Sequence, residues 1–229
     1  MPKCLLLDLD GTLVDSVPDL AAALNRLVEA HGLAPFSGTE TARMVGDGVE
    51  RLVRRAFAAR GQTPSAEDIA AYVADYGANY AVATRLYPDV EVTLRAMRAD
   101  GWRLAVCTNK LERPARALLE AMKIGDLFAA IGGGDSFPVR KPDPAHLLAT
   151  LERAGGAIQS SVMAGDHAND VKSAVGAGIP CIFAGWGYGT LDMAQGAVAV
   201  ARSFADLPGL ASALLPAAEG RNAQSPSLR

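Results

Sequence analysis

Residues 4–12 have the sequence CLLLDLDGT, a short apolar run that ends in two aspartates, a glycine and a threonine. The apolar part is too short for a buried helix and shows little alternation, which is typical of a strand covered on both faces of a parallel sheet. We therefore expect the first strand over residues 4–9. The same pattern recurs in WRLAVC at 102–107, LFAAI at 127–131, SVMAG at 161–165 and PCIFAG at 180–185.

Amphipathic helical patterns separate these runs in the second half of the chain. They are DVEVTLRAMRAD at 89–100, RPARALLEAMK at 113–123, DPAHLLATLERAG at 143–155 and NDVKSAVGAG at 169–178. An alternation of strands and helices indicates a parallel sheet with helices on both faces. The fold class we expect is therefore α/β, with a Rossmann-like parallel-sheet core.

Residues 16–85 break this alternation, because they contain only helical patterns. These are DLAAALNRLVEAHG at 19–32, VERLVRRAFAARG at 49–61 and SAEDIAAYVADYGANYAVATR at 65–85. We expect a small all-helical domain inserted into a discontinuous core of residues 1–15 and 86–216, with a hinge at Tyr87-Pro88. Residues 217–229 have no large apolar side chain apart from Leu228, which predicts a flexible tail.

Composition excludes several classes of protein. The 229 residues include 22 basic and 25 acidic side chains, a net charge of −3, so nothing in the charge favours nucleic-acid binding. No apolar stretch approaches the ~20 residues of a membrane span, and the first residues do not resemble a secretory signal. The odd, scattered cysteines indicate buried free thiols rather than disulfides or a zinc site. We expect a cytoplasmic protein that binds no membrane, and the oligomeric state stays open. The cysteines are Cys4, Cys107 and Cys181.

Polar and acidic residues follow three of the predicted strands. Ligands of open parallel sheets bind beyond the carboxyl ends of the strands, so these residues are candidates for a common site. Several carboxylates gathered there would repel one another unless a cation neutralised them, and oxygen ligands suit Mg²⁺ better than zinc. Mg²⁺ beside a lysine and a Gly-Thr turn suits a phosphoryl group, so we expect phosphoryl transfer. The candidates are Asp8, Asp10, Thr108, Asn109, Lys141, Asp166 and Asp170.

Four motifs together resemble those of the haloacid dehalogenase superfamily, in the order that the superfamily uses. They are DLDGT at 8–12, TN at 108–109, KPDP at 141–144 and GDHAND at 165–170. The helical insertion after the first motif resembles the C1 cap of that superfamily. The resemblance covers essentially the whole core.

The resemblance implies a role for each motif residue. Asp8 resembles the nucleophile that accepts the phosphoryl group, and Asp10 resembles the acid/base that protonates the leaving alcohol and then activates water. Thr108, Asn109 and Lys141 correspond to phosphate-binding positions. One carboxylate oxygen of Asp8, the backbone carbonyl of Asp10 and the side chain of Asp166 correspond to the Mg²⁺ ligands.

Asp170 has two interpretations. It resembles a residue that holds a metal-bound water or orients Lys141, and it is equally placed to cap a helix that begins near Asn169.

The aspartate at position 10 favours a phosphatase or phosphomutase over a dehalogenase or phosphonatase. Within that branch, four segments resemble phosphoglycolate phosphatases, which implies a small phosphorylated metabolite, 2-phosphoglycolate, as the substrate. A phosphosugar phosphatase or phosphomutase is the alternative in the same superfamily, and a phospho-accepting signalling domain is the alternative in another class. The segments are DLDGTLVDS at 8–16, VGDGVERLVRRA at 45–56, CTNK at 107–110 and GGDSFPVRKPDP at 133–144.

Two features of the insertion are candidates for substrate specificity. Arg51, Arg54 and Arg55 fall on the polar side of their helix and are most simply a solvated face. Alternatively, one of them pairs with a substrate carboxylate, and we take Arg51 as that candidate. Gly46, in the turn that enters this helix, would then belong to a loop that closes over the ligand. The glycine-rich residues 185–189 are expected to form a loop near the site.

Overall fold

The computed structural model describes residues 2–216 and has a six-stranded sheet at its centre. The strand order is β5-β4-β1-β6-β7-β8 and every pair of neighbours is parallel, which confirms the predicted α/β, Rossmann-like class. β1 lies between β4 and β6. The strands are β1 (Cys4–Leu7), β4 (Arg103–Cys107), β5 (Phe128–Gly132), β6 (Ser161–Gly165), β7 (Cys181–Ala184) and β8 (Ala199–Ala201).

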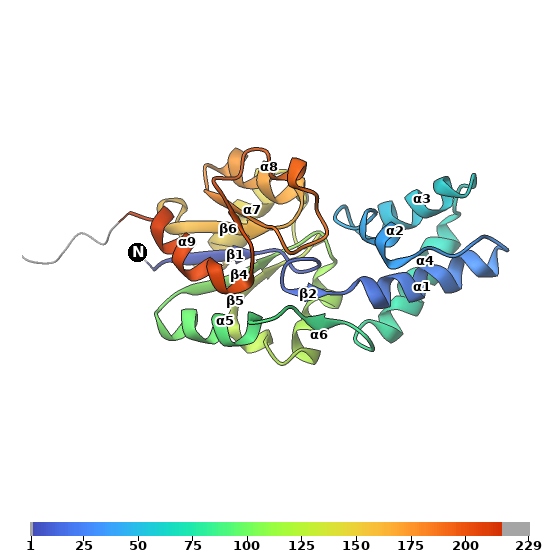
Figure 1. Ribbon diagram of the computed structural model, residues 1–229, viewed down its shortest axis with the longest axis horizontal. Coiled ribbons are helices and arrows are strands. Elements are labelled where there is room, and N and C mark those ends of the chain that lie inside the picture. Colours follow the sequence, from blue (N-terminus) through green and yellow to red (C-terminus); the bar gives the residue numbers. More distant parts are fainter. Residues whose placement is uncertain (1, 217–229) are drawn as a thin grey trace, which may run out of the picture.

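Side chains of β1 alternate between two apolar clusters, one on each face of the sheet. Leu5 and Leu7 belong to the cluster under α5, α6 and α9, whereas Cys4 and Leu6 belong to the cluster under α7 and α8. Figure 1 shows these two helical layers on opposite sides of the strands. The helices are α5 (Val90–Ala99), α6 (Glu112–Ala121), α7 (Pro144–Arg153), α8 (Ala168–Ala177) and α9 (Leu207–Leu214), with short 3-10 turns η1 (Gly125–Leu127), η2 (Ile158–Ser160), η3 (Leu191–Ala194) and η4 (Phe204–Asp206).

Residues 17–79 form a helical bundle with an apolar cluster of its own (Figure 1). Its helices are α1 (Val17–Ala30), α2 (Gly38–Ala42), α3 (Val49–Ala59) and α4 (Ala66–Asn79). Capping boxes at Ser37 and Ser65 begin α2 and α4, where serine side chains accept the N–H groups that a first helical turn leaves free. α3 buries Leu52, Val53, Ala56 and Phe57.

A two-stranded antiparallel ribbon joins the bundle to the core. It pairs β2 (Val14–Asp15) with β3 (Arg85–Leu86), so the chain leaves and re-enters the core at one place. The buried carboxylate of Asp19, in the first turn of α1, accepts hydrogen bonds from the backbone N–H groups of Ala83 and Thr84. These hydrogen bonds join the segment that leaves the core to the segment that returns to it, directly before the predicted hinge at Tyr87-Pro88.

Other expectations concern the chain as a whole. No helix within residues 2–216 has the length and apolar character needed to cross a membrane. Cys4, Cys107 and Cys181 are free and buried, as predicted. The predicted flexible tail, residues 217–229, lies outside the described residues.

Candidate active site

Three aspartates from two parts of the chain meet at the carboxyl end of the sheet. Asp8 follows β1, Asp166 follows β6, and Asp170 lies in the first turn of α8. Each offers a carboxylate oxygen within 4.8 Å of the others, and all three side chains are buried. Because β1 and β6 are parallel neighbours, the residues that follow them share one edge of the sheet.

The turn after Asp8 packs the first motif, DLDGT, against the fourth, GDHAND. Gly11 has a φ of +86°, and a Cβ there would collide with the carboxylate of Asp166, so only glycine fits. Thr12 Oγ1 donates to Asp166 Oδ1 at 2.8 Å. The backbone N–H of Leu9 donates to Asp8 Oδ1 at 2.7 Å, which holds that carboxylate in place.

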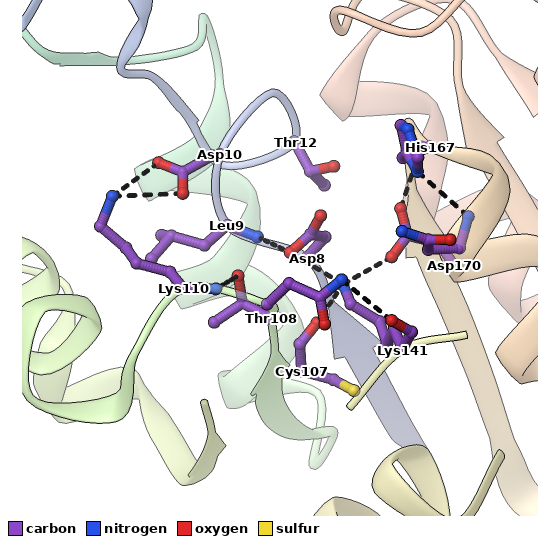
Figure 2. A network of polar contacts seen from close by, with 12 residues as sticks. Asp8, Leu9, Asp10, Thr12, Cys107, Thr108, Lys110, Lys141, His167 and Asp170 are labelled. Atoms are coloured by element: carbon purple, nitrogen blue, oxygen red, sulfur yellow. Dashed lines mark hydrogen bonds and ion pairs between the residues drawn. The ribbon is translucent and has the colours of Figure 1, made fainter. Parts of the chain in front are cut away.

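Lys141 is the cation inside this cluster. Its Nζ lies 2.9 Å from Asp8 Oδ1 and 2.6 Å from Asp170 Oδ1, and it donates to the carbonyl oxygen of Cys107 at 2.6 Å. Burial lowers the pKa of Lys141, but the two carboxylates outweigh it and raise the pKa above its usual value. Figure 2 shows the lysine between Asp8 and Asp170. Its side chain is 1% exposed, so the ammonium group lies inside the site and not at its surface.

Asp170 satisfies both interpretations that the sequence left open. One oxygen accepts from Lys141, and Oδ2 accepts the backbone N–H of His167 at 2.9 Å as part of a capping box at the start of α8. A single carboxylate therefore orients the buried lysine and begins the helix.

The pKa values of two carboxylates are raised. Burial raises the pKa of Asp8 to about 6, although Lys141 opposes the shift. Burial, followed by the charges of Asp8 and Asp170, raises the pKa of Asp166 to about 8. Crowded carboxylates with only oxygen donors fit a hard divalent cation such as Mg²⁺, which would relieve the repulsion that raises these values.

The side chain of Asp10 points away from the three-aspartate cluster. It accepts hydrogen bonds from Ser16 Oγ at 2.6 Å and from Lys110 Nζ at 3.1 and 3.2 Å. Lys110 Nζ also donates to the hydroxyl of Tyr76, on α4 of the helical bundle, at 2.9 Å. The CTNK segment did not predict a role for Lys110. The only available signal was that Lys110 follows Thr108 and Asn109 directly.

Asn109 connects the core to the bundle. Its Nδ2 donates to the carbonyl oxygens of Gly46, at 2.9 Å, and of Lys141, at 3.0 Å, while its buried Oδ1 has no hydrogen-bond partner within residues 2–216. Asn169 reinforces this contact by donating to Asp47 Oδ1 at 2.7 Å. The loop of residues 46–48 is thus docked on two core motifs. Thr108, beside Asn109, is buried, and its Oγ1 accepts the N–H of Lys110 at 3.2 Å.

Two pockets open beside Asp8 and Asp10, and Gly46 lines both. The first lies between the core and the bundle and includes Lys110. The second includes Asp166, His167, Arg43 and Tyr188.

Arg51 is exposed on the side of α3 opposite its buried stripe and lines neither pocket. Its neighbour Arg55 pairs with Asp47 instead. Residues 185–189 do lie at the site, because the N–H of Tyr188 donates to Asp166 Oδ2 at 2.9 Å.

Comparisons with known proteins agree with this geometry. The family model described as haloacid dehalogenase-like hydrolase matches residues 2–178, which include Asp8, Lys141 and Asp166. The chain belongs to the haloacid dehalogenase-like hydrolases. This hydrolase carries Asp8, Asp166 and Asp170 together at one edge of the sheet.

Similar proteins place this hydrolase among phosphatases. It is 42% identical over 216 residues to a phosphoglycolate phosphatase of Rhodospirillum rubrum, with 90% of each chain covered. It is 41% identical to one of Agrobacterium fabrum, with 83% of each covered. A crystal structure of a predicted phosphoglycolate phosphatase from Haemophilus somnus superposes with a TM-score of 0.83 at 31% identity, covering 91% of this chain and 97% of that one. This haloacid dehalogenase-like hydrolase is accordingly a phosphoric monoester hydrolase.

Proposed function

We propose that this hydrolase is a Mg²⁺-dependent phosphatase that acts on 2-phosphoglycolate through an aspartyl phosphate on Asp8. The observation that carries the proposal is the buried carboxylate of Asp8, held 2.9 Å from Lys141 and beside Asp166. The names of the relatives point to the substrate. A small phosphorylated metabolite also suits the pocket that opens from Asp8 towards the bundle.

Asp8 is the nucleophile of this proposal. Leu9 and Lys141 both contact Oδ1, so Oδ2 is the oxygen directed at phosphorus. Its attack forms a bond from carboxylate oxygen to phosphorus and breaks the bond from phosphorus to the glycolate oxygen. Lys141, together with Thr108 and Asn109, holds the phosphoryl group. Asp170 positions Lys141 and so acts through it.

Asp10 moves the protons. In the first step its protonated carboxyl donates to the departing glycolate oxygen, which leaves Asp10 ionised. In the second step ionised Asp10 takes a proton from a water that attacks the aspartyl phosphate, releasing inorganic phosphate and restoring Asp8. Asp8, the backbone carbonyl of Asp10 and Asp166 would hold Mg²⁺, which when bound neutralises charge on the carboxylates and the phosphoryl group.

Residues 16–85 act in this proposal as a cap that excludes bulk water during the first transfer. The contacts of Gly46 with Asn109 and of Tyr76 with Lys110 support this role, because they join the bundle to the core beside Asp8 and Asp10. The free, buried thiols suit a reducing compartment, so we place the activity in the cytoplasm.

The test is release of inorganic phosphate from a panel of phosphomonoesters, with Mg²⁺ and with EDTA. We expect the highest kcat/KM on 2-phosphoglycolate, loss of activity in EDTA, and a loss on the order of 10³-fold or more in Asp8→Asn. Asp126→Asn, at an exposed position, is the matched control. Normal turnover by Asp8→Asn would exclude it as nucleophile. An isomerised sugar phosphate would indicate a mutase, and an aspartyl phosphate that persists for minutes would indicate a signalling domain.

A further inference from the structure

The pocket between the core and the bundle has a single positively charged side chain in its lining. Its acidic residues are Asp8 and Asp10, at the core end. Among the residues that line this pocket, Lys110 is the only cation. The bundle contributes mostly apolar side chains, which are Leu20, Val45, Val49, Leu52, Tyr72 and Val73.

Lys110 is held where core and bundle meet. Its side chain is 8% exposed, and its Nζ donates to both oxygens of Asp10 and to the hydroxyl of Tyr76. The Tyr76 hydroxyl accepts that bond, and its own proton has no acceptor among residues 2–216. Lys110 and Tyr76 therefore present an ammonium and a hydroxyl proton side by side. Figure 2 shows Lys110 and Asp10 facing each other to one side of Asp8, away from Lys141.

The two buried lysines fall on opposite sides of the nucleophile. Lys141 contacts Asp8 directly and lies on the side where the proposed reaction places the phosphoryl group. Lys110 contacts the proposed acid/base, which is the group that meets the leaving oxygen. Arg43 lines the other pocket, together with Asp166 and His167. On the leaving-group side, Lys110 is therefore the cation that a second negative charge of the substrate would meet.

The position of Lys110 favours a substrate whose leaving group is negatively charged. The ammonium of Lys110 is largely buried, and the carboxylate of Asp10 is its counter-ion. A carboxylate on the leaving group would lie beside the same ammonium as a second anion. Glycolate has such a group one carbon from its ester oxygen.

We propose that Lys110 and the Tyr76 hydroxyl form the subsite that binds the carboxylate of the substrate. The proposal rests on the proposed phosphatase function and identifies what selects the leaving group. Lys110 donates a charged hydrogen bond to the carboxylate, and Tyr76 donates a second from its free proton. Because Tyr76 lies on α4, binding the carboxylate also ties the bundle to the core.

The test compares two substrates that differ only in this group, 2-phosphoglycolate and 2-hydroxyethyl phosphate. We expect Lys110→Met to lower the ratio of kcat/KM for the acid over the alcohol by about 10- to 100-fold, the effect of a lost charged hydrogen bond. Tyr76→Phe keeps the ring that stacks on Tyr72 and should lower the ratio by several-fold. Lys172→Met, at an exposed position on α8, is the matched control and should leave the ratio unchanged.

The outcomes separate this subsite from the reaction itself. Equal losses on both substrates in Lys110→Met and Tyr76→Phe would overturn the proposal, since the two residues would then act only through Asp10. A wild-type ratio near one would also overturn it while leaving the phosphatase intact. Release of phosphate from other esters but not from 2-phosphoglycolate would instead refute the proposed substrate, and the subsite with it. If the melting temperature of Lys110→Met is far below that of the wild type, the ratio of kcat/KM measured for Tyr76→Phe decides whether the proposal holds.

Discussion

Tyr188 caps helix α1 at Ser16, the residue before its first turn, which lies 172 residues earlier in the chain. Its hydroxyl oxygen accepts the backbone N–H of Ser16 at 2.7 Å and of Val17 at 3.1 Å, and its proton goes to Asp15 at 2.9 Å. Ser16 is a residue type that normally caps a helix with its own hydroxyl. Here that hydroxyl donates to Asp10 instead, at 2.6 Å, so the phenol of Tyr188 frees Ser16 to hold the proposed acid/base.

Removing this phenol should weaken the start of α1. We expect Tyr188→Phe to lower the free energy of unfolding by about 1 kcal/mol, the usual cost of a lost helix cap. Urea denaturation measures the change. Tyr80→Phe is the matched control, because no hydrogen bond joins that hydroxyl to any residue of the 2–216 range. If Ser16 turned back to cap its own helix, stability would recover and kcat would fall, since Asp10 would lose a partner.

Stability in the absence of metal should fall as the pH rises. The pKa values of Asp8 and Asp166 are raised to about 6 and about 8, so above pH 4 these two groups hold more protons in the folded protein than in the unfolded chain. Stability therefore decreases towards pH 8, as these groups ionise against each other. Melting temperatures in EDTA between pH 5 and 8 measure this effect.

Mg²⁺ should reverse that trend, because it binds the ionised carboxylates. We expect the increase in melting temperature on adding Mg²⁺ to be larger at pH 8 than at pH 5.5. Asp166→Asn should reduce both the fall of melting temperature with pH in EDTA and the increase in melting temperature on adding Mg²⁺. An equal increase at both pH values would contradict a site made of these carboxylates.

Gly46 should tolerate no side chain while His167 is present. Its φ is +117°, and a Cβ there would lie 2.7 Å from the imidazole Cδ2 of His167. We expect Gly46→Ala to displace the docked loop, raising KM about tenfold, with a backbone cost of roughly 1–2 kcal/mol. Steady-state kinetics on 2-phosphoglycolate measure the change. The double variant with His167→Ala removes the collision and should recover part of the affinity, whereas the strain of the positive φ remains.

Lys141 should be needed for stability as well as for activity. Lys141→Met leaves Asp8 and Asp170 buried without their cation, which should cost about 3–5 kcal/mol of folding free energy in EDTA. Adding Asp170→Asn removes one of the two stranded charges and should restore part of the stability but none of the activity. Denaturation and phosphate release measured on the same samples separate the two effects. Recovery of activity in the double variant would argue against a direct role of Lys141 in holding phosphate.

The local pattern of apolar and polar residues was sufficient to predict the central strands and the motif residues at their ends. The strand at residues 4–7 and the aspartate after it could be predicted from the sequence, because an apolar run and the acidic residue that ends it are adjacent in the chain. β8 and α9 were missed. β8 has only three small residues at the edge of the sheet, and α9 is short and follows a 3-10 turn, so neither has a clear period.

Contacts between distant segments were decided only by the tertiary structure. Nothing near Lys110 in the chain indicates that it pairs with Asp10 and Tyr76, and nothing near Tyr188 indicates that it caps α1. Arg51, suggested by its polar helix face, is exposed, because that face turns to solvent. Sequence spacing determines which residues share a face or follow a strand. Which faces then meet depends on how the bundle packs on the core, and this packing brings Lys110 and Tyr76 together beside the nucleophile.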